Sequence, residues 1–301
     1  MKLELLDGTV QTIRDVKSRP IRIDNDVKRV LDFEDAYYVL LADANENLEL
    51  PRELGHNMTV LDYMFASSVV NPDISEWDTS HVTSMIGTFM DSKYTGDLSN
   101  WDVSNVVTMR DMFYNADHDG DLSKWNVSSV IDLSGTFAYS SQNHDLSTWD
   151  VSNVTTLRGT FEGSSYTGSL SGWNVSRVTD MSLTFYKSHI KDGLSNWDVS
   201  SVLYMIATFS YAEFDDDIHA WPVQNVTDMS AMFSYSDFNH DISNWPIDNV
   251  TDMNSMFFKS KYSWPLTNWR LKTRDVITKH MLIGSPLEPK SDEPEPYVIS
   301  V

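Results

Sequence analysis

The stretch WDVSNVVTM, residues 101–109, recurs with small changes as WDVSNVTTL at 149–157 and as WDVSSVLYM at 197–205. Nine of the ten tryptophans follow one another every 24 residues without insertion or deletion: Trp77, Trp101, Trp125, Trp149, Trp173, Trp197, Trp221, Trp245 and Trp269. Phenylalanine repeats with the same step from Phe65 to Phe257. A fixed period of this kind indicates a repeat protein in which each repeat packs on its neighbours.

Apolar residues occupy fixed positions in each repeat, and we number these positions from the tryptophan. Position −3 is Leu or Ile and −9 is always Ser or Ala; +5 is Val from Val82 through Val250, and +8 is Met or Leu from Met85 through Met253. Several inward apolar groups and one small residue are what stacked, near-identical layers require. The predicted structural core contains Trp101, Trp125, Trp149, Trp173, Trp197, Phe113, Phe137, Phe161 and Phe185.

The spacing within a repeat suggests its architecture. Alternation around Trp and +2 favours a short strand over L-S-x-W-D-V, and +5 to +8 favours a second one. The pattern M-x-x-M-F is typical of one helical or 3-10 turn, whereas propeller blades need about 40 residues. The predicted fold class is therefore mainly β: a right-handed, leucine-rich-repeat-like solenoid of about nine 24-residue coils, with parallel short strands, one helical or 3-10 turn per coil, and capping segments.

The repeat W-D-V-S-N-V-T-x-M-x-x-M-F, followed by a Ser-containing turn and D-L-S-x-W, resembles that of BspA-like leucine-rich-repeat surface proteins. This repeat also occurs in mycoplasma-type surface lipoproteins and in some eukaryotic and large-virus proteins. The resemblance covers roughly residues 51–281. It implies a surface-displayed protein that acts in adhesion and protein binding. The chain shows no signal peptide, lipidation cysteine or wall anchor, so we expect a virion or cytoplasmic assembly slightly ahead of a bacterial cell surface.

The ends of the chain differ in composition from the repeats. We expect an N-terminal cap at residues 1–50, the repeats at 51–281, and an extended, acidic, proline-rich arm at 282–301. The arm ends in the apolar sequence YVISV. That ending is either a plain tail or a strand that adds to the edge of a sheet.

Composition excludes several classes of function. The 22 basic and 44 acidic residues give a formal charge of −22, which opposes binding to nucleic acid or to an anionic membrane. The absence of cysteine rules out thiolate metal sites and cysteine nucleophiles. The longest apolar run, residues 36–42, is too short to span a bilayer, so we expect no membrane insertion.

The polar residues of the repeat point to turns rather than to catalysis. Asp or Asn follows most of the tryptophans and lies two residues before Ser, which suits an Asx-turn; a ladder of cation-binding acids is the alternative. The stretch DHDGD at 117–121 resembles a calcium loop, but the twelfth place is Ser128 instead of an acid. The histidines are scattered over the repeat. We therefore predict no enzyme, cofactor or metal site.

Positions −1 and −8 vary most between repeats, so we take them as the candidate contact stripe. The alternative is that they vary because nothing touches them. The predicted function is a non-catalytic repeat scaffold for protein–protein interaction or assembly, as a surface or structural component of a virion or cell surface. A cation-dependent glycan-binding or adhesion module on a bacterial surface is the alternative. The stripe contains Lys93, Asn100, Lys124, Thr148, His189 and Asn196.

Overall fold

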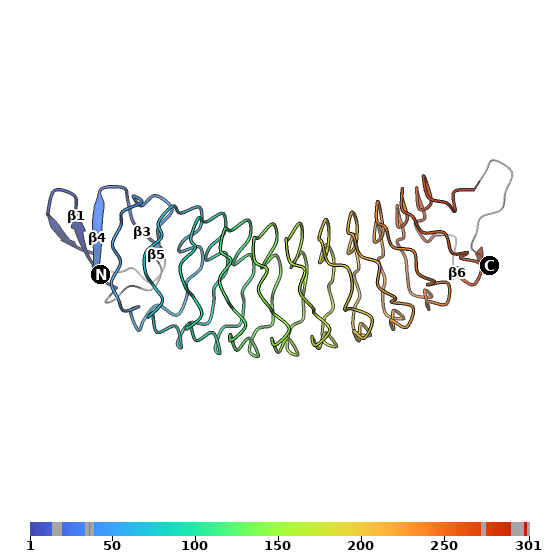
Figure 1. Cartoon of the computed structure of the whole chain (residues 1–301), viewed down its shortest axis with the longest axis horizontal. Coiled ribbons are helices and arrows are strands. Elements are labelled where there is room, and N and C mark those ends of the chain that lie inside the picture. The colour runs from blue at the N-terminus through green and yellow to red at the C-terminus, as the bar shows by residue number, and fades with distance from the viewer. Residues whose placement is uncertain (14–19, 34–35, 37–38, 272–274, 290–297, 300–301) are drawn as a thin grey trace. The chain divides into compact units, whose positions relative to one another are not determined.

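The structure is a computed structural model that describes residues 1–13, 20–33, 36, 39–271, 275–289 and 298–299. The chain divides into two compact units, Met1–Asn153 and Val154–Val301. Within each unit, successive repeats follow one another as layers (Figure 1).

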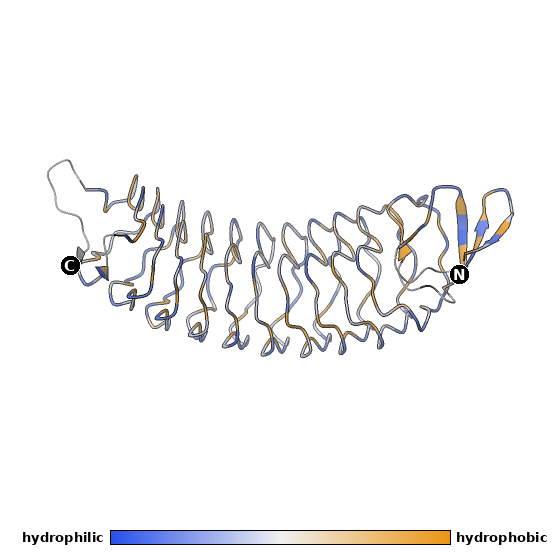
Figure 2. Cartoon of the chain, turned by 180° about the vertical axis from the view of Figure 1, so that it is seen from behind, coloured by the Kyte–Doolittle hydropathy of each residue, from blue (hydrophilic) through white to orange (hydrophobic). Residues whose placement is uncertain are grey.

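A small antiparallel sheet forms the beginning of the first unit. Strand β1 (Lys2–Leu5) lies between β2 (Val10–Thr12) and β4 (Val27–Asp32). Leu3 and Val30 are register partners on the buried side of this sheet, 3% and 1% exposed. Figure 2 shows the resulting mixture of apolar and polar residues along the strands. One face therefore joins the core while the other faces solvent.

The chain next covers the first repeat layer. Strands β3 (Ile21–Arg22) and β5 (Val39–Leu40) pair in parallel. Directly after β5, the Leu41 N–H donates to the Met64 carbonyl at 2.8 Å, and the Leu41 carbonyl accepts from Ser68 Oγ at 3.2 Å. Backbone groups of the first layer thus find partners in the N-terminal segment instead of remaining unpaired.

The predicted fold class is wrong in its secondary structure. From residue 50 to residue 269 the chain forms neither helix nor strand, and its β-pairing is reduced to isolated parallel bridges. One residue per repeat makes each bridge, at position +7 as far as Asp252 and at position +8, Ile277, in the last repeat. In the first unit the bridges join Val60, Ser84, Thr108 and Asp132; in the second they join Thr156, Asp180, Tyr204, Asp228, Asp252 and Ile277. A mainly β solenoid with short strands and a helical turn per coil is therefore not what the chain forms.

Tight turns occupy the segments where strands were expected. The Trp101 N–H donates to the Leu98 carbonyl at 3.1 Å, and the Val106 N–H donates to the Val103 carbonyl at 2.9 Å. Each bond closes an i to i+3 turn, which reverses the chain direction and stops an extended strand from growing. The alternating apolar residues still face inward, but they do so from successive turns.

The segment M-x-x-M-F also differs from its predicted helical turn. The Met112 N–H donates within the layer to the Met109 carbonyl at 3.0 Å, but the intervening Asp111 N–H donates to Ser134 in the next layer at 2.8 Å. Asp111 has φ of 55°, in the left-handed region, through which a right-handed helix cannot continue. Other repeats have a positive φ at this position too, at Gly87, Gly135, Gly159, Leu183, Ala207 and Ala231.

Columns of aromatic rings form the core of each unit. The rings of Trp77 and Trp101 stack with centroids 6.3 Å apart and planes 9° apart. In the second unit, Phe185 and Phe209 stack at 5.6 Å and 8°. The nine core residues named from the sequence are all buried, at most 4% exposed: Trp101, Trp125, Trp149, Trp173, Trp197, Phe113, Phe137, Phe161 and Phe185.

The last layer belongs to the second unit. Strand β6 (Arg270–Leu271) pairs in parallel with β7 (Val298–Ile299), so the apolar end of the chain joins its own second unit. The Ile283 carbonyl accepts from the Lys259 N–H at 2.7 Å, which extends the layer contacts past residue 281. Of the predicted arm at 282–301, residues 290–297 and 300–301 lie outside the described part of the chain.

Candidate interaction surfaces

The acidic or amide residue that follows most of the periodic tryptophans closes a turn. The Ser104 N–H donates to Asp102 Oδ1 at 2.9 Å, and Asn126 Oδ1 accepts from Ser128 N–H at 3.2 Å in the next repeat. Because Asp and Asn accept this bond equally well, the interpretation as an Asx-turn is confirmed.

The three carboxylates of the calcium-like stretch DHDGD each contact a different partner. Asp117 Oδ2 is 3.0 Å from Lys93 Nζ, while Asp119 Oδ1 accepts from Asn143 N–H at 3.1 Å. Asp121 Oδ1 accepts from Ser123 N–H at 2.9 Å. Among the described residues, no three His, Asp or Glu side chains are placed to hold a metal ion.

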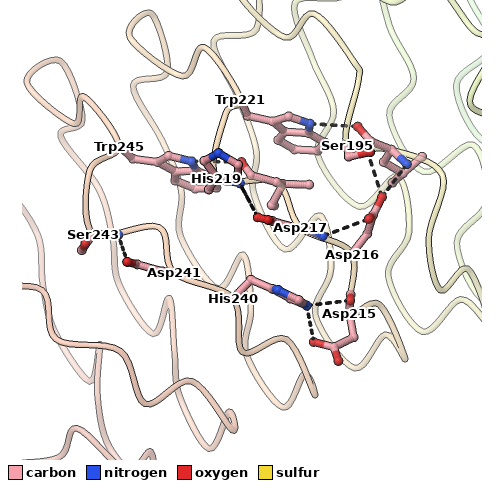
Figure 3. Close-up of polar contacts among 12 residues, drawn as sticks. Ser195, Asp215, Asp216, Asp217, His219, Trp221, His240, Asp241, Ser243 and Trp245 are labelled. Carbon is pink, nitrogen blue, oxygen red and sulfur yellow. Dashed lines mark hydrogen bonds and ion pairs between the residues drawn. The ribbon is translucent and has the colours of Figure 1, made fainter.

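The densest acidic run, residues 215–217, is drawn in Figure 3. Asp216 points back into the preceding layer, where its Oδ2 accepts from the backbone N–H groups of Leu194 and Ser195, each at 2.9 Å. The Asp217 N–H donates to Asp216 Oδ1 at 2.9 Å. Asp216 is thus a backbone-binding carboxylate that joins two layers.

The neighbouring histidines each meet a different acid of this run (Figure 3). His219 Nδ1 lies 2.9 Å from Asp217 Oδ1, and the His219 N–H and ring together hold the pKa of the Asp217 carboxyl below its usual range. His240 Nε2 lies 2.8 Å from the Asp215 carbonyl and 3.3 Å from its carboxylate. Since the acids turn to separate neighbours, the run fastens layers together and does not converge on one point.

The predicted contact stripe is exposed, and parts of it are already engaged. Lys93 forms the ion pair with Asp117, one repeat later, and His189 Nδ1 lies 3.1 Å from Glu213 Oε1 in the same relation. Thr148 Oγ1 donates to the Ser123 carbonyl at 2.7 Å. Lys93, Asn100, Lys124 and Thr148 lie in the first unit, and His189 and Asn196 in the second.

Sequence reasoning missed a row of exposed aromatic side chains in the second unit. Tyr211 and Tyr235 are 46% and 38% exposed, and their rings stack at 4.3 Å and 12°. Tyr186 meets Tyr211 edge-on at 5.9 Å, and Phe258 meets Tyr235 edge-on at 5.4 Å. Four consecutive repeats therefore contribute one aromatic ring each to a continuous row.

Two lysines close the row at its ends. Lys187 Nζ lies 5.1 Å from the Tyr186 ring centroid and 5.7 Å from that of Tyr211. Lys259 Nζ lies 5.3 Å from the Tyr235 centroid and 5.4 Å from that of Phe258. These distances are in the range of cation–π attraction. We call the set Tyr186, Lys187, Tyr211, Tyr235, Phe258 and Lys259 the tyrosine row.

The tyrosine row leaves a sequence signal, although not in a single position. Its aromatic group is at +13 in Tyr186 and Phe258 but at +14 in Tyr211 and Tyr235. Counting one position at a time therefore shows at most two consecutive aromatic residues, Tyr211 and Tyr235, and not a row of four. Reading +13 and +14 as a pair would have revealed it.

Comparisons with known proteins give one family. The sequence profile of a family described as "Mycoplasma protein of unknown function, DUF285" matches residues 52–142, 92–192 and 184–285. Neither the curated proteins nor the solved structures include a match. The part of the chain that the structure describes holds no helix long and apolar enough to cross a membrane.

Proposed function

The chain belongs to the DUF285 family of mycoplasma proteins of unknown function, and from that premise we propose that it is a non-catalytic repeat scaffold that binds other proteins. Its repeats would present a surface to a protein partner in a larger assembly. Three tandem, overlapping matches to the same family support the repeat organisation.

The tyrosine row is the observation that carries this proposal. Large apolar side chains that are exposed singly need no explanation, but rings aligned across consecutive layers form a contiguous surface. Tyr211 and Tyr235 belong to the residue types that are enriched at protein interfaces. By contrast, Asp102, Asn126 and Asp216 are occupied in turns and layer contacts.

The resemblance to BspA-like surface proteins supports a more specific version of the proposal. Such a scaffold would be displayed on a cell surface or built into a particle, where it would act in adhesion or assembly. The alternative of a cation-dependent glycan-binding module has less support, because Asp117, Asp119 and Asp121 diverge to separate partners.

Site-specific photo-crosslinking in the native source tests the proposal. A benzophenone side chain would replace Tyr235 in the tyrosine row, Lys124 in the contact stripe, or Leu6 in the N-terminal segment as a control; Leu6 is 65% exposed. We expect discrete protein adducts from Tyr235 or Lys124 and none from Leu6. The scaffold function is contradicted if neither repeat position yields an adduct, or if all three positions yield the same ones.

A further inference from the structure

We propose that the tyrosine row is a docking site for an extended acidic peptide segment of a partner protein. This inference rests on the proposed function and adds the chemistry of the partner. The row spans four repeats of the second unit, in the order Lys187, Tyr211, Tyr235 and Lys259 along position +14.

The ring faces of the row are already covered. Tyr211 stacks on Tyr235 at 4.3 Å, and Lys187 of the preceding repeat lies over its ring. Tyr235 is covered in the same way by Tyr211 and by Lys259 of the following repeat. A neutral sugar that stacks on an aromatic face finds no open face on Tyr211 or Tyr235. What the row presents outward is hydroxyl groups and ammonium groups, which donate hydrogen bonds and attract anions.

Within the four repeats of the row, the two acids next to its positions pair with other cations; Glu162, at +13 of the repeat before the row, lies outside this set. Glu213 is paired with His189 at 3.1 Å and with Lys191 at 3.4 Å. Asp237 is paired with Lys261 at 2.8 Å. His189, Glu213, Asp237 and Lys261 are at position −8, two residues beyond the row, and Lys191 is at position −6. The row is therefore a locally cationic surface on a chain whose formal charge is −22.

That overall charge favours a short ligand over a long one. Exposed charges are screened beyond about 8–10 Å at physiological salt, so an acidic segment confined to the row responds mainly to Lys187 and Lys259. A long polyanion would also meet the acidic remainder of the chain. This argument favours an acidic peptide segment over nucleic acid or a long anionic polysaccharide.

Backbone conformation argues that the row is not required by the fold. Lys187, Tyr211, Tyr235 and Lys259 have φ between 53° and 58°, in the left-handed region. The same position holds Asp91, Asn115, Tyr139 or Gly163 in other repeats. Asp, Asn and Gly adopt this conformation most readily, whereas other residues cost on the order of 1 kcal/mol there. The side chains of the row thus occupy positions where the backbone would accept a simpler residue.

Layer spacing sets the length of the ligand. Parallel bridges link Asp180, Tyr204, Asp228 and Asp252 in the repeats that carry the row. At about 4.8 Å per layer, Lys187 and Lys259 are roughly 14 Å apart. An extended peptide rises about 3.3 Å per residue, so two carboxylates about four residues apart would reach both lysines.

Fluorescence anisotropy with the full chain tests the site. The probe is a fluorescein-labelled peptide of alternating Glu and Pro, and the matched peptide replaces each Glu with Gln. We expect only the Glu peptide to bind, and K187Q/K259Q to weaken it about tenfold or more. The variant Y211N/Y235N should weaken binding as well, because Asn115 shows that Asn fits this position. The control K2Q/K28Q removes two exposed lysines of the N-terminal sheet, outside both the row and the contact stripe, and should leave binding unchanged.

Three results would overturn the proposal: equal binding to K187Q/K259Q, equal binding of the Gln peptide, or no binding of either peptide. Binding of a heparin fragment at Lys187 and Lys259 without binding of the Glu peptide would assign the row to an anionic polysaccharide instead. Thermal melting of each variant shows that it is folded, and the exposed lysine pair keeps the test valid if Y211N/Y235N is unstable. Protein adducts at Lys124 without peptide binding would defeat this proposal while leaving the scaffold function intact.

Discussion

The indole Nε1 of Trp197 donates a hydrogen bond to the backbone carbonyl of Leu170, 3.1 Å away in the preceding repeat. That carbonyl also accepts from the Trp173 N–H at 3.0 Å, so the tryptophan fills its own layer and gives the layer before it a second hydrogen bond at a buried carbonyl. Phenylalanine could supply the ring but not the donor. The same bond joins Trp101 to Ile74, Trp125 to Leu98, Trp149 to Leu122, Trp221 to Leu194, Trp245 to Ile218 and Trp269 to Ile242.

Trp197→Phe should lower the free energy of unfolding by about 1 kcal/mol, because the buried Leu170 carbonyl loses one of its two donors and keeps the Trp173 N–H. Trp197→Ala should cost about 3–5 kcal/mol, since it also leaves a cavity. Urea denaturation of both variants measures the difference. Trp264→Phe is the control for burial: its indole N–H also donates to a carbonyl, that of Asn239 at 2.8 Å, but the side chain is 44% exposed, so water can replace the lost donor. A loss for Trp264→Phe as large as for Trp197→Phe would contradict the role given to the indole N–H.

The Asx-turn predicts different outcomes for two substitutions of Asp198. Asp198→Asn should be nearly neutral at pH 7, because Asn174 makes the same turn one repeat earlier. Asp198→Ala should cost about 1 kcal/mol, because the Ser200 N–H loses its acceptor. Thermal melting of the two variants beside the parent chain provides the measurement, and equal melting temperatures for Asn and Ala would exclude the turn as the reason for this residue.

Acid should weaken this turn in the parent chain but not in Asp198→Asn. Hydrogen bonds from the hydroxyl and backbone N–H of Ser200 hold the pKa of the Asp198 carboxyl below its usual value. The stabilisation is present above that usual value and is lost as the pH falls through the lowered one. The difference in stability between parent and Asp198→Asn should therefore change only on acidification.

His118 makes the first unit sensitive to mild acid. Its side chain is fully buried beside Phe113, and neither ring nitrogen has a partner within the described residues. Burial lowers the pKa of His118 to about 4, although the negative charges of Asp119 and Asp97 act to raise it. The unfolded chain binds a proton near pH 6.5, whereas the folded chain does not until about pH 4. Stability is therefore complete above pH 6.5 and declines by up to roughly 3 kcal/mol toward pH 4.

His118→Tyr should remove much of this decline, because Tyr94 and Tyr166 occupy the equivalent position in other repeats. Denaturation curves between pH 4 and pH 7 would show a flatter profile than that of the parent chain. His144→Gln is the control, since its side chain is 44% exposed. An unchanged slope in His118→Tyr would show that other groups cause the acid sensitivity.

Gly96 gives the Tyr94 side chain the room it needs. A Cβ atom at Gly96 would clash with the Tyr94 hydroxyl and lie 2.5 Å from its Cζ. Gly96→Ala should therefore cost about 1–3 kcal/mol through overpacking. Tyr94→Val should relieve the clash, since Val70 occupies the same position in the preceding repeat. A double-mutant cycle measures the coupling, and simple additivity of the two changes would argue against the contact.

The sequence predicted the period and the inward-facing residues because each depends on a side chain that recurs. Trp101 and Phe113 repeat with their layers, and both are buried. The paired Asp102 and Ser104 were also sufficient to predict the turn. Features of this kind can be recognised from a single sequence, because the same residue type recurs at the same position in successive repeats.

Secondary structure could not be predicted in the same way. Met109, Met112 and Phe113 have the spacing of a helix face, but alternate N–H groups donate to the next layer instead of within a helix. The left-handed residue between them is Asp111 in this repeat, and Leu183 or Ala207 elsewhere. Leu and Ala give no sign of a positive φ. The apolar spacing of this segment therefore fits either a helix or a series of turns. The two differ in whether each backbone N–H donates within the layer or to the next layer.

The hydrogen bonds at Asp111 and its equivalents have a consequence for gene duplication. In each unit, a layer donates to the next layer from N–H groups at +8, +10, +12 and +14, and it accepts from the previous layer at carbonyls of +7, +9, +11 and +13. A block of 24 residues can then be gained or lost without creating an unmatched junction, whereas any other length shifts the Trp and Phe columns out of alignment. We expect relatives of this chain to differ in length by whole repeats, with the tyrosine row retained or lost as a block.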